Sequence, residues 1–197
     1  MATIQSIVDR CRLELIDTSG TPRWTDPEFL GFYNQFLEEV ATLASDRVAV
    51  VQNLNFAAGV KQTLPSTIRL LLAIERNANG RACAPFNRES LQRFDPDWTT
   101  ATPVAYVSQY DYDPSTPRVV YVNPPLSGPA VVEARVVPVL PAAADLADIM
   151  AIAEDLFPAV FNYMLFRACA KEAEDTAMAA KSAAYYQRMT QILGGAQ

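Results

Sequence analysis

The spacing of apolar residues changes twice along this chain of 197 residues. Near both ends apolar side chains recur every three or four residues, which is the spacing of one helix face. Between Arg47 and about Leu140 they form short β-branched or aromatic runs separated by Gly, Pro, Asn and Asp, as strands and turns do. The pattern predicts an α+β fold, in which a discontinuous helical bundle of two N-terminal and two C-terminal helices carries an inserted antiparallel β domain. We expect the bundle to comprise residues 1–46 and 142–197 and the β domain residues 47–141.

Two helices are expected in the N-terminal part. Residues 4–15 place five apolar side chains on one face, and the turn-forming residues that follow should end this helix. The second helix should begin after Thr25, which can cap a free backbone N–H while Glu28 reaches back to the cap. It should run to about Ser45, and its apolar stripe is wide enough to pack two sides against other elements.

Two further helices are expected at about residues 154–174 and 177–193, the second ending at a pair of glycines. The first carries aromatic residues on opposite sides, which predicts either burial deep within a bundle or contact with another subunit. Pro158 lacks a backbone N–H, so this helix should start near Phe157 or kink at the proline.

The middle of the chain contains six runs with the composition of strands. In the last of them Glu133 and Arg135 alternate with apolar residues, which indicates a strand with one solvated face. We expect the fifth run to pair with the fourth, and a short helical turn at residues 88–93. The six expected strands are residues 48–51, 54–57, 68–74, 104–110, 118–122 and 131–139.

Charge and the absence of histidine argue against several classes of function. The 16 Lys and Arg against 22 Asp and Glu give a net charge of −6, the wrong sign for gripping nucleic-acid phosphates. The charge is −5 over residues 1–46, +2 over 47–141 and −3 over 142–197. Without histidine the chain lacks the commonest general base, Ser–His and Cys–His pairs and nearly every catalytic zinc arrangement. We therefore expect no catalytic residue, no metal and no cofactor.

Cys11, Cys83 and Cys169 are odd in number and widely spaced, so they match neither a disulfide framework nor a metal-binding pair. We expect all three to be inert thiols among apolar neighbours. The first nine residues do not resemble a signal peptide, and the best apolar stretch, residues 149–165, is interrupted by acids and a proline. The sequence predicts a soluble protein without membrane association.

Two polar patterns that could suggest ligand binding have plainer explanations. Asp111, Asp113 and Ser115 have the alternate spacing of a calcium loop, but the later glycine and glutamate of such a loop are missing, which favours a surface turn. A loose run of arginines could contact phosphate, but the net charge favours surface pairing with acids of the same or an adjoining subunit. The run consists of Arg69, Arg76, Arg81, Arg88 and Arg93.

A series of short motifs follows the amphipathic first helix. The N-terminal motifs are Arg23-Trp24-Thr25-Asp26 with Leu30, Asn34 and Glu38, then Gln62-Thr63-Leu64-Pro65 and Arg76-Asn77. The later motifs are Pro96-Asp97-Trp98, Asp113-Pro114, Val120-Tyr121-Val122-Asn123-Pro124-Pro125, Val132-Glu133, and Leu165-Phe166-Arg167-Ala168 with Lys171, Glu172, Ala173 and Glu174. In their order and total length they resemble the head-to-tail adaptor, or connector, proteins of tailed phages. Over residues 4–193 the chain is similar to the tail tubular protein A and portal-adaptor family of short-tailed phages.

This resemblance implies a small helical bundle with a β insertion and a structural role without enzymatic activity. About twelve copies would form a ring beneath the portal protein, extend the DNA channel, and carry the nozzle or tail tubular protein and, in some phages, tail fibres. DNA would pass through an acidic lumen without specific binding, because such a lumen repels a polyanion. The protein would be made in the host cytoplasm and reside in the virion at the head–tail junction.

Related adaptors often dock through the C-terminal helix or tail. The resemblance therefore implies portal docking by residues 194–197 and by Tyr185, Tyr186, Met189, Ile192 and Leu193.

Two alternatives stay open. A small binding module without catalysis is one. The other is a carboxylate-based cell-wall glycan hydrolase of a phage tail, which would use two acidic pairs whose settings are otherwise typical of a turn and a solvated helix end. These pairs are Asp95 with Asp97 and Glu172 with Glu174.

Overall fold

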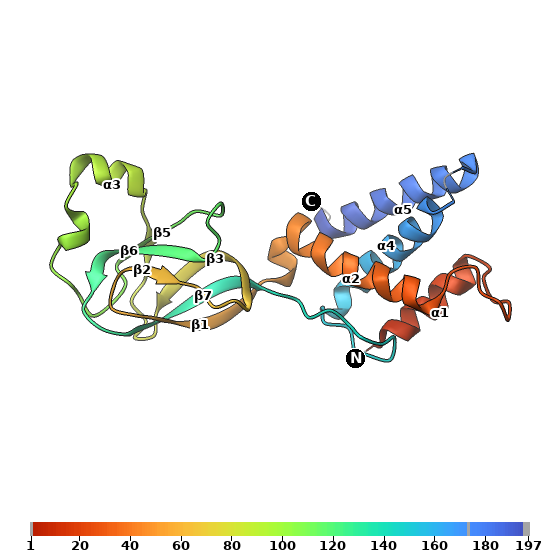
Figure 1. Cartoon of the computed structure of the whole chain (residues 1–197), viewed down its shortest axis with the longest axis horizontal. Helices are drawn as coiled ribbons and strands as arrows, with labels where there is room; N and C mark the ends of the chain where they lie inside the picture. The colour runs from red at the N-terminus through yellow and green to blue at the C-terminus, as the bar shows by residue number, and fades with distance from the viewer. Residues whose placement is uncertain (1, 173, 195–197) are drawn as a thin grey trace. The chain divides into compact units, whose positions relative to one another are not determined.

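The structure is a computed structural model and describes residues 2–172 and 174–194. It divides into two compact units. We call Met1–Val48 together with Leu140–Gln197 the helical unit, and Ala49–Val139 the β unit. Helices and sheets are both present, so the predicted α+β class is confirmed (Figure 1).

The described part of the helical unit contains four α-helices, and all four lie where the sequence predicts helices. Glu28 accepts a 2.8 Å hydrogen bond from the backbone N–H of Thr25, which completes the predicted capping box. The prediction for residues 154–174 was too long, because Pro158 occupies the first turn of its helix and the residues before Phe157 form a 3-10 turn. The helices are α1 (Ile4–Glu14), α2 (Asp26–Leu43), α4 (Phe157–Ala170) and α5 (Thr176–Gly194), with 3-10 turns at Ser45–Val48 and Glu154–Leu156.

Helix α4 is central to the helical unit, since α1, α2 and α5 all contact it. Trp24 is 1% exposed and its indole N–H donates a 3.2 Å hydrogen bond to the carbonyl of Ala168. On another side of α4, the ring of Tyr163 lies 5.5 Å from that of Phe36 in α2. Much of the apolar surface of α4 is therefore buried inside its own unit, whereas Phe157, Phe161 and Phe166 are only half-buried.

The β unit contains two sheets. The first has the strand order β1 (Val50–Phe56), β7 (Ala130–Pro138), β3 (Ile68–Asn77), and both pairings are antiparallel. The second has the order β2 (Gly59–Thr63), β6 (Val119–Leu126), β5 (Gln109–Tyr112), β4 (Ala84–Pro85). Its pairings are antiparallel except for the short parallel pair of β4 and β5, so the predicted antiparallel domain has one exception. Helix α3 (Arg88–Phe94) and a 3-10 turn at Trp98–Thr100 connect β4 to β5.

Several strand predictions need correction. Residues 48–51 and 54–57 are not separate strands, because β1 runs through the polar residues between them. The prediction for residues 104–110 was mostly wrong: only Gln109 and Tyr110 of that range lie in a strand that pairs antiparallel with β6, and Val104 forms an isolated parallel bridge to Leu126 of β6. The N–H of Val107 does not pair with a strand and instead donates a 2.8 Å hydrogen bond to the side-chain oxygen of Asn77. Strands β2 and β4 were missed, since both are short and neither is rich in large apolar residues.

The core of the β unit is largely aliphatic. In β7 the side chains of Val132, Ala134 and Val136 are fully buried, whereas Arg135 is exposed and Glu133 half-buried, so the predicted alternation is confirmed. These three side chains join one cluster with residues of both sheets. No helix within residues 2–172 and 174–194 is both long and apolar enough to cross a membrane.

Candidate functional site

The five side chains predicted to dock lie on α5, but they do not form a single exposed surface. Met189 is fully buried and Leu193 is 6% exposed, so both anchor α5 in the core of its unit. The other three, Tyr185, Tyr186 and Ile192, are half-buried. Of the predicted tail, Gly194 ends α5 and residues 195–197 lie outside the described residues.

The two tyrosines each tie α5 to another helix. The hydroxyl of Tyr185 donates a 3.0 Å hydrogen bond to Glu14 in α1. Burial, followed by this hydrogen bond, raises the pKa of Tyr185 to about 12, so the phenol remains a donor at neutral pH. The ring of Tyr186 lies 5.0 Å from that of Phe166 in α4. Both rings therefore stabilise the helical unit and present only part of their surface to solvent.

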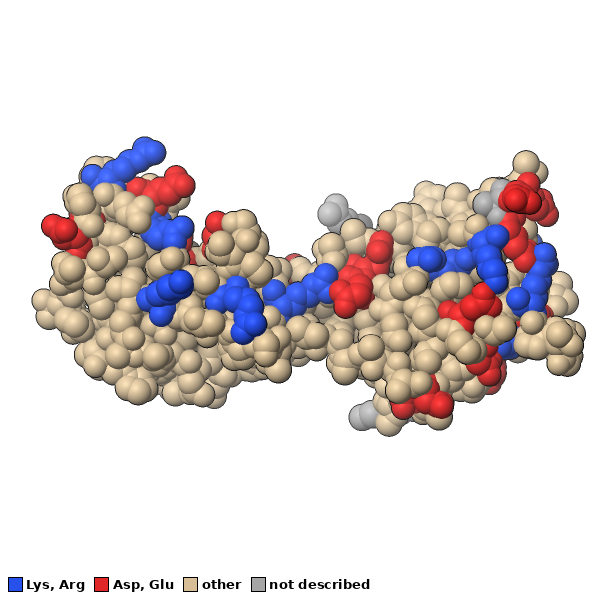
Figure 2. Space-filling view, in the orientation of Figure 1, with Lys and Arg blue, Asp and Glu red and all other residues tan. Residues whose placement is uncertain are grey.

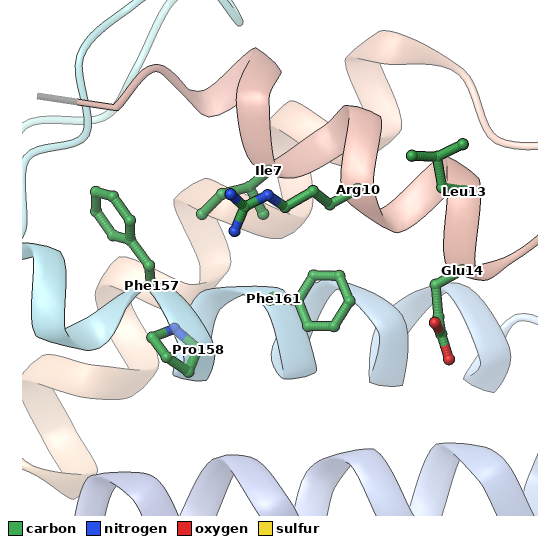
Figure 3. A pocket seen from close by; sticks show the side chains of 7 residues that line it. All are labelled: Ile7, Arg10, Leu13, Glu14, Phe157, Pro158 and Phe161. Atoms are coloured by element: carbon green, nitrogen blue, oxygen red, sulfur yellow. The ribbon is translucent and has the colours of Figure 1, made fainter.

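An apolar groove of about 530 Å³ lies between α1 and α4 (Figure 3). Its charged residues are Arg10 and Glu14, both from α1, and Figure 3 shows their charged groups toward opposite ends of the groove. The apolar lining comes from both helices: Ile7 and Leu13 of α1, and Phe157, Pro158 and Phe161 of α4.

The local sequence explains why this groove is open. Ile7 is 3% exposed and fills the contact between α1 and α4, whereas Leu13 lies off the buried face and is 68% exposed. Phe157 and Pro158 open α4, where Phe157 is half-buried and Pro158 is exposed. The groove thus combines a buried floor with an exposed apolar edge, a combination typical of contact surfaces.

The loop after α1 is held by a buried carboxylate. Asp17 is 6% exposed and accepts hydrogen bonds from the backbone N–H groups of Arg23, at 2.8 Å, and Trp24, at 3.3 Å. Arg12 bonds to Asp17 at 3.2 Å and to Asp26 at 2.6 Å, so its guanidinium joins α1, the loop and the start of α2. This network fixes the C-terminal end of α1, where the groove edge lies.

Ile16, at the start of that loop, has an unusual conformation for its residue type. Its φ of 56° is in the left-handed region, where a β-branched side chain is strained, and its side chain is 87% exposed. The backbone N–H of Asp17 bonds back to the carbonyl of Arg12 at 2.8 Å, which is the closing bond of a Schellman C-cap. Ile16 therefore occupies a position where glycine is usual, and it adds exposed apolar surface near Leu13.

The acidic pairs of the hydrolase alternative are divided between the two units. Asp95 accepts a 3.2 Å hydrogen bond from the backbone N–H of Asp97 in the β unit, as expected of a turn. In the helical unit Glu172 forms an ion pair with Arg23, and Glu174 is exposed. Glu172 and Glu174 line a polar pocket together with Asp175, Arg23 and Lys171, so basic groups lie beside these acids. Among the described residues no group of three or more His, Cys, Asp or Glu could hold a metal ion.

The segment with the spacing of a calcium loop, which includes Asp113 and Ser115, forms a surface turn. The carboxylate of Asp113 accepts hydrogen bonds from the backbone N–H of Ser115, at 2.8 Å, and from its hydroxyl, at 2.6 Å. These bonds lower the pKa of Asp113 and are typical of an Asx turn. The surface turn that the sequence favours is therefore confirmed.

The cysteines have the surroundings of unreactive thiols. Cys11 and Cys169 are fully buried, Cys83 is half-buried, and all three are free. Burial raises the pKa of each thiol, that of Cys83 to about 11, so the reactive thiolate is scarce at neutral pH.

The arginines of the β unit mostly have partners within the unit. Arg76 pairs with Glu133 at 3.0 Å and Arg88 with Asp111 at 3.6 Å. The guanidinium of Arg81 lies 3.8 Å from the centre of the Tyr106 ring. These contacts agree with surface pairing rather than a phosphate site, and Figure 2 shows basic groups spread over the visible face of the β unit.

The most exposed large apolar side chain of the described residues was missed from the sequence. Phe94, at the end of α3, is 89% exposed, and α3 buries none of its residues. Its sequence signal was available, because an aromatic residue between Arg93 and Asp95 does not belong to an apolar stripe. The exposure of Leu13 was harder to foresee, because the same leucine could have extended the buried face of α1.

The family model described as SU10 adaptor protein matches residues 2–197, nearly the entire chain. A search of curated proteins gave no match.

Proposed function

The chain belongs to the SU10 adaptor protein family, and on that premise we propose that it forms a head-to-tail ring beneath the portal of a phage. Family membership makes it a phage adaptor protein with a structural role in the virion. The finer proposal is a ring of about twelve copies that extends the DNA channel, as in the tail tubular protein A family that the sequence resembles. The observation that carries the proposal is the family match over residues 2–197.

The proposed partners are the portal protein above the ring and the nozzle or tail tubular protein below it, with tail fibres as a further possibility in some phages. The charge of the chain supports a conduit that does not bind its cargo. With a net charge of −6, the protein repels the DNA phosphates on average, so DNA would slide through the lumen without specific contacts.

We place the portal contact on α5, with a revised set of residues. Tyr185, Tyr186 and Ile192 retain partly exposed surface and can touch a partner. Met189 and Leu193 are buried, so they would act by holding the helix in position. Deleting the end of α5 would remove these two anchors, and a point substitution is therefore the better test.

Sedimentation velocity with negative-stain imaging tests the ring. The purified protein is measured alone and then mixed with the portal protein of the same phage. We expect a portal-bound ring in the mixture, whether or not the free protein assembles. A monomer that ignores the portal would contradict the adaptor ring and favour a small binding module.

The α5 contact is tested in the same mixture with Tyr186→Asp. A carboxylate at the proposed interface should weaken portal binding, because an unpaired charge is costly to bury. Tyr186→Phe is the matched control, since it keeps the ring against Phe166. Circular dichroism of both variants verifies the helices. Normal portal binding by a folded Tyr186→Asp variant would remove the contact from this face of α5.

A further inference from the structure

Helix α3 presents Phe94 as a fixed apolar projection of the β unit. The side chain of Asn87 caps the helix by accepting a 2.8 Å hydrogen bond from the N–H of Ser90, and the N–H of Asp95 closes it on the carbonyl of Leu91 at 2.8 Å. Beyond the two ends of the helix, the rings of Phe86 and Trp98 meet edge to face with their centres 5.8 Å apart, and Trp98 is 3% exposed. The segment is therefore anchored in the β unit, while Phe94 at its end is 89% exposed.

The charges beside Phe94 complement those of the α1–α4 groove. Arg93 precedes the phenylalanine and Asp95 follows it, whereas the groove carries Glu14 toward one end and Arg10 toward the other (Figure 3). In the part of the chain that the structure describes, no residue forms an ion pair or hydrogen bond with the side chain of Arg10 or of Arg93. Both cations are thus available to a partner.

The groove also has the size and lining that a phenyl ring requires. A cavity of about 150 Å³ accommodates a benzene ring, and the groove measures about 530 Å³. Phe157 and Phe161 supply aromatic surface in it, and ring pairs are favourable in edge-to-face or offset arrangements.

We propose that the groove between α1 and α4 of one copy receives Phe94 of a second copy, with Arg93 beside Glu14 and Asp95 beside Arg10. This inference rests on the proposed ring and names a contact within it. Because the two surfaces differ, the interface is heterologous. Repeated interfaces of this kind close into a ring when the rotation between neighbouring copies permits.

The net charges of the two units favour the same pairing over longer distances. The helical unit has 8 basic and 15 acidic residues, a net charge of −7, and the β unit has 8 basic and 7 acidic residues, a net charge of +1. The β unit of one copy is therefore attracted to the helical unit of another, whereas two helical units repel each other. A contact made by one side chain and its neighbours is small, so we expect weak association between free copies.

Disulfide trapping between two differently tagged full-length chains tests the contact. One chain carries Leu13→Cys at the groove edge and the other Ser90→Cys, an exposed position one helical turn before Phe94 that leaves the phenylalanine in place. The wild-type chain with its native cysteines is oxidised in parallel. We expect a mixed dimer from the mixture and only the wild-type background from either variant alone. A mixture that gives no more dimer than wild type would overturn the proposal, and so would equal cross-linking by Ser90→Cys alone.

A charge reversal then tests the arrangement of the four charged residues. Adding Arg10→Glu to the Leu13→Cys chain should lower the mixed-dimer yield about fivefold, and adding Asp95→Arg to the Ser90→Cys chain should restore it. Lys181→Glu, an exposed reversal outside the groove, is the matched control. An equal loss with Lys181→Glu, or no restoration, would contradict the pairing.

The same chains distinguish this inference from the proposed function. If a portal-bound ring forms but no mixed dimer is trapped, the Phe94 contact is wrong and the adaptor ring stands. If neither forms, both proposals fail.

Discussion

In the helical unit the buried polar side chain that fixes a loop carries a charge, whereas in the β unit it is a neutral amide. Asp17 is 6% exposed, and it binds two backbone N–H groups and the guanidinium of Arg12. Asn77 is 4% exposed, and its amide donates to the carbonyl of Val107 at 2.8 Å and accepts from the N–H of the same residue at 2.8 Å. Both side chains hold a loop by hydrogen bonds to its backbone, but the buried carboxylate of Asp17 also has a cation beside it, whereas the partners of the Asn77 amide are neutral.

The difference matters when one partner is lost. The Asn77 amide also donates to the carbonyl of Arg81 at 3.0 Å, and all of its partners are neutral groups, so its removal leaves only neutral groups unpaired. A buried carboxylate is compensated by a cation, and the removal of Asp17 takes one of two carboxylate partners from Arg12, whose side chain is only 15% exposed. We therefore expect the helical unit to be the more sensitive of the two to substitution at its loop.

The largest expected effect is that of Asp17→Ala. It should destabilise the helical unit by about 3 kcal/mol, because Arg12 loses a buried partner and two N–H groups lose their acceptor. Denaturation followed by tryptophan fluorescence can assign the loss, since the chain has two tryptophans, Trp24 in the helical unit and Trp98 in the β unit. In a Trp98→Phe background the midpoint should fall, and Asp9→Ala, on the exposed face of α1, should leave it nearly unchanged.

Asn77→Ala sharpens the comparison from the other side. We expect a loss of about 2 kcal/mol, because the carbonyl and N–H of Val107 remain buried without their amide partner. The loss should appear in Trp98 fluorescence in a Trp24→Phe background. Asn79→Ala, at an exposed position of the same turn, is the control. If Asn77→Ala cost more than Asp17→Ala, the proposed difference between a charged and a neutral anchor would be wrong.

Local sequence signals predicted much of the fold, and distant partners account for most of what was missed. The capping box at Thr25 and the proline at Pro158 act within one helical turn, so both helix starts could be predicted. Asp17 and Asn77 find their partners through the folded chain, and nothing in their neighbouring residues marks them as buried. Strand β4 has only two residues and pairs in parallel, so no periodicity could reveal it.

The predicted docking residues illustrate the same limit. Helical spacing placed Met189 on one face of α5 together with its neighbours, but spacing alone does not tell whether a face meets a partner or the core. In the structure this face packs into the helical unit, where Met189 is fully buried. Phe94 lies outside any apolar stripe, which is a sequence signal of exposure, and the structure adds that α3 buries none of its residues.

The stability of the helical unit should depend on pH through the ionisation of Glu28. Hydrogen bonds from Lys171 and from the backbone N–H of Thr25 lower the pKa of Glu28 to about 2. A folded-state pKa below the unfolded value stabilises the folded protein above pH 4.5, and this contribution is lost as the pH falls from about 4.5 to 2. Since the pair is partly exposed, we expect about 1 kcal/mol.

The measurement is the unfolding free energy from Trp24 fluorescence across that pH range, for the wild type and for Glu28→Gln. The variant should lose its acid-dependent part. Glu89→Gln, on exposed α3 of the β unit, should change nothing in this signal. An unchanged slope in Glu28→Gln would show that other carboxylates cause the acid sensitivity of the helical unit.

The smallest effect concerns backbone conformation, in which the units also differ. The β unit uses glycine at its positive φ angles, Gly59 at 104° and Gly80 at 86°, whereas the helical unit places Ile16 at 56°. Ile16→Gly should therefore stabilise the helical unit, by about 0.5–1 kcal/mol, since relief of the left-handed strain exceeds the added entropy of the unfolded chain. Gly80→Ala should have the opposite sign in the β unit, because a Cβ there meets no atom within 4 Å and only the backbone is strained. Thermal unfolding should show a higher midpoint temperature for Ile16→Gly and a lower one for Gly80→Ala than for the wild type. If Ile16→Gly lowers stability, the isoleucine side chain stabilises the monomer by more than its left-handed backbone conformation costs. If the variant is more stable but assembles into rings more weakly, this strained residue is kept for contact with a neighbouring copy.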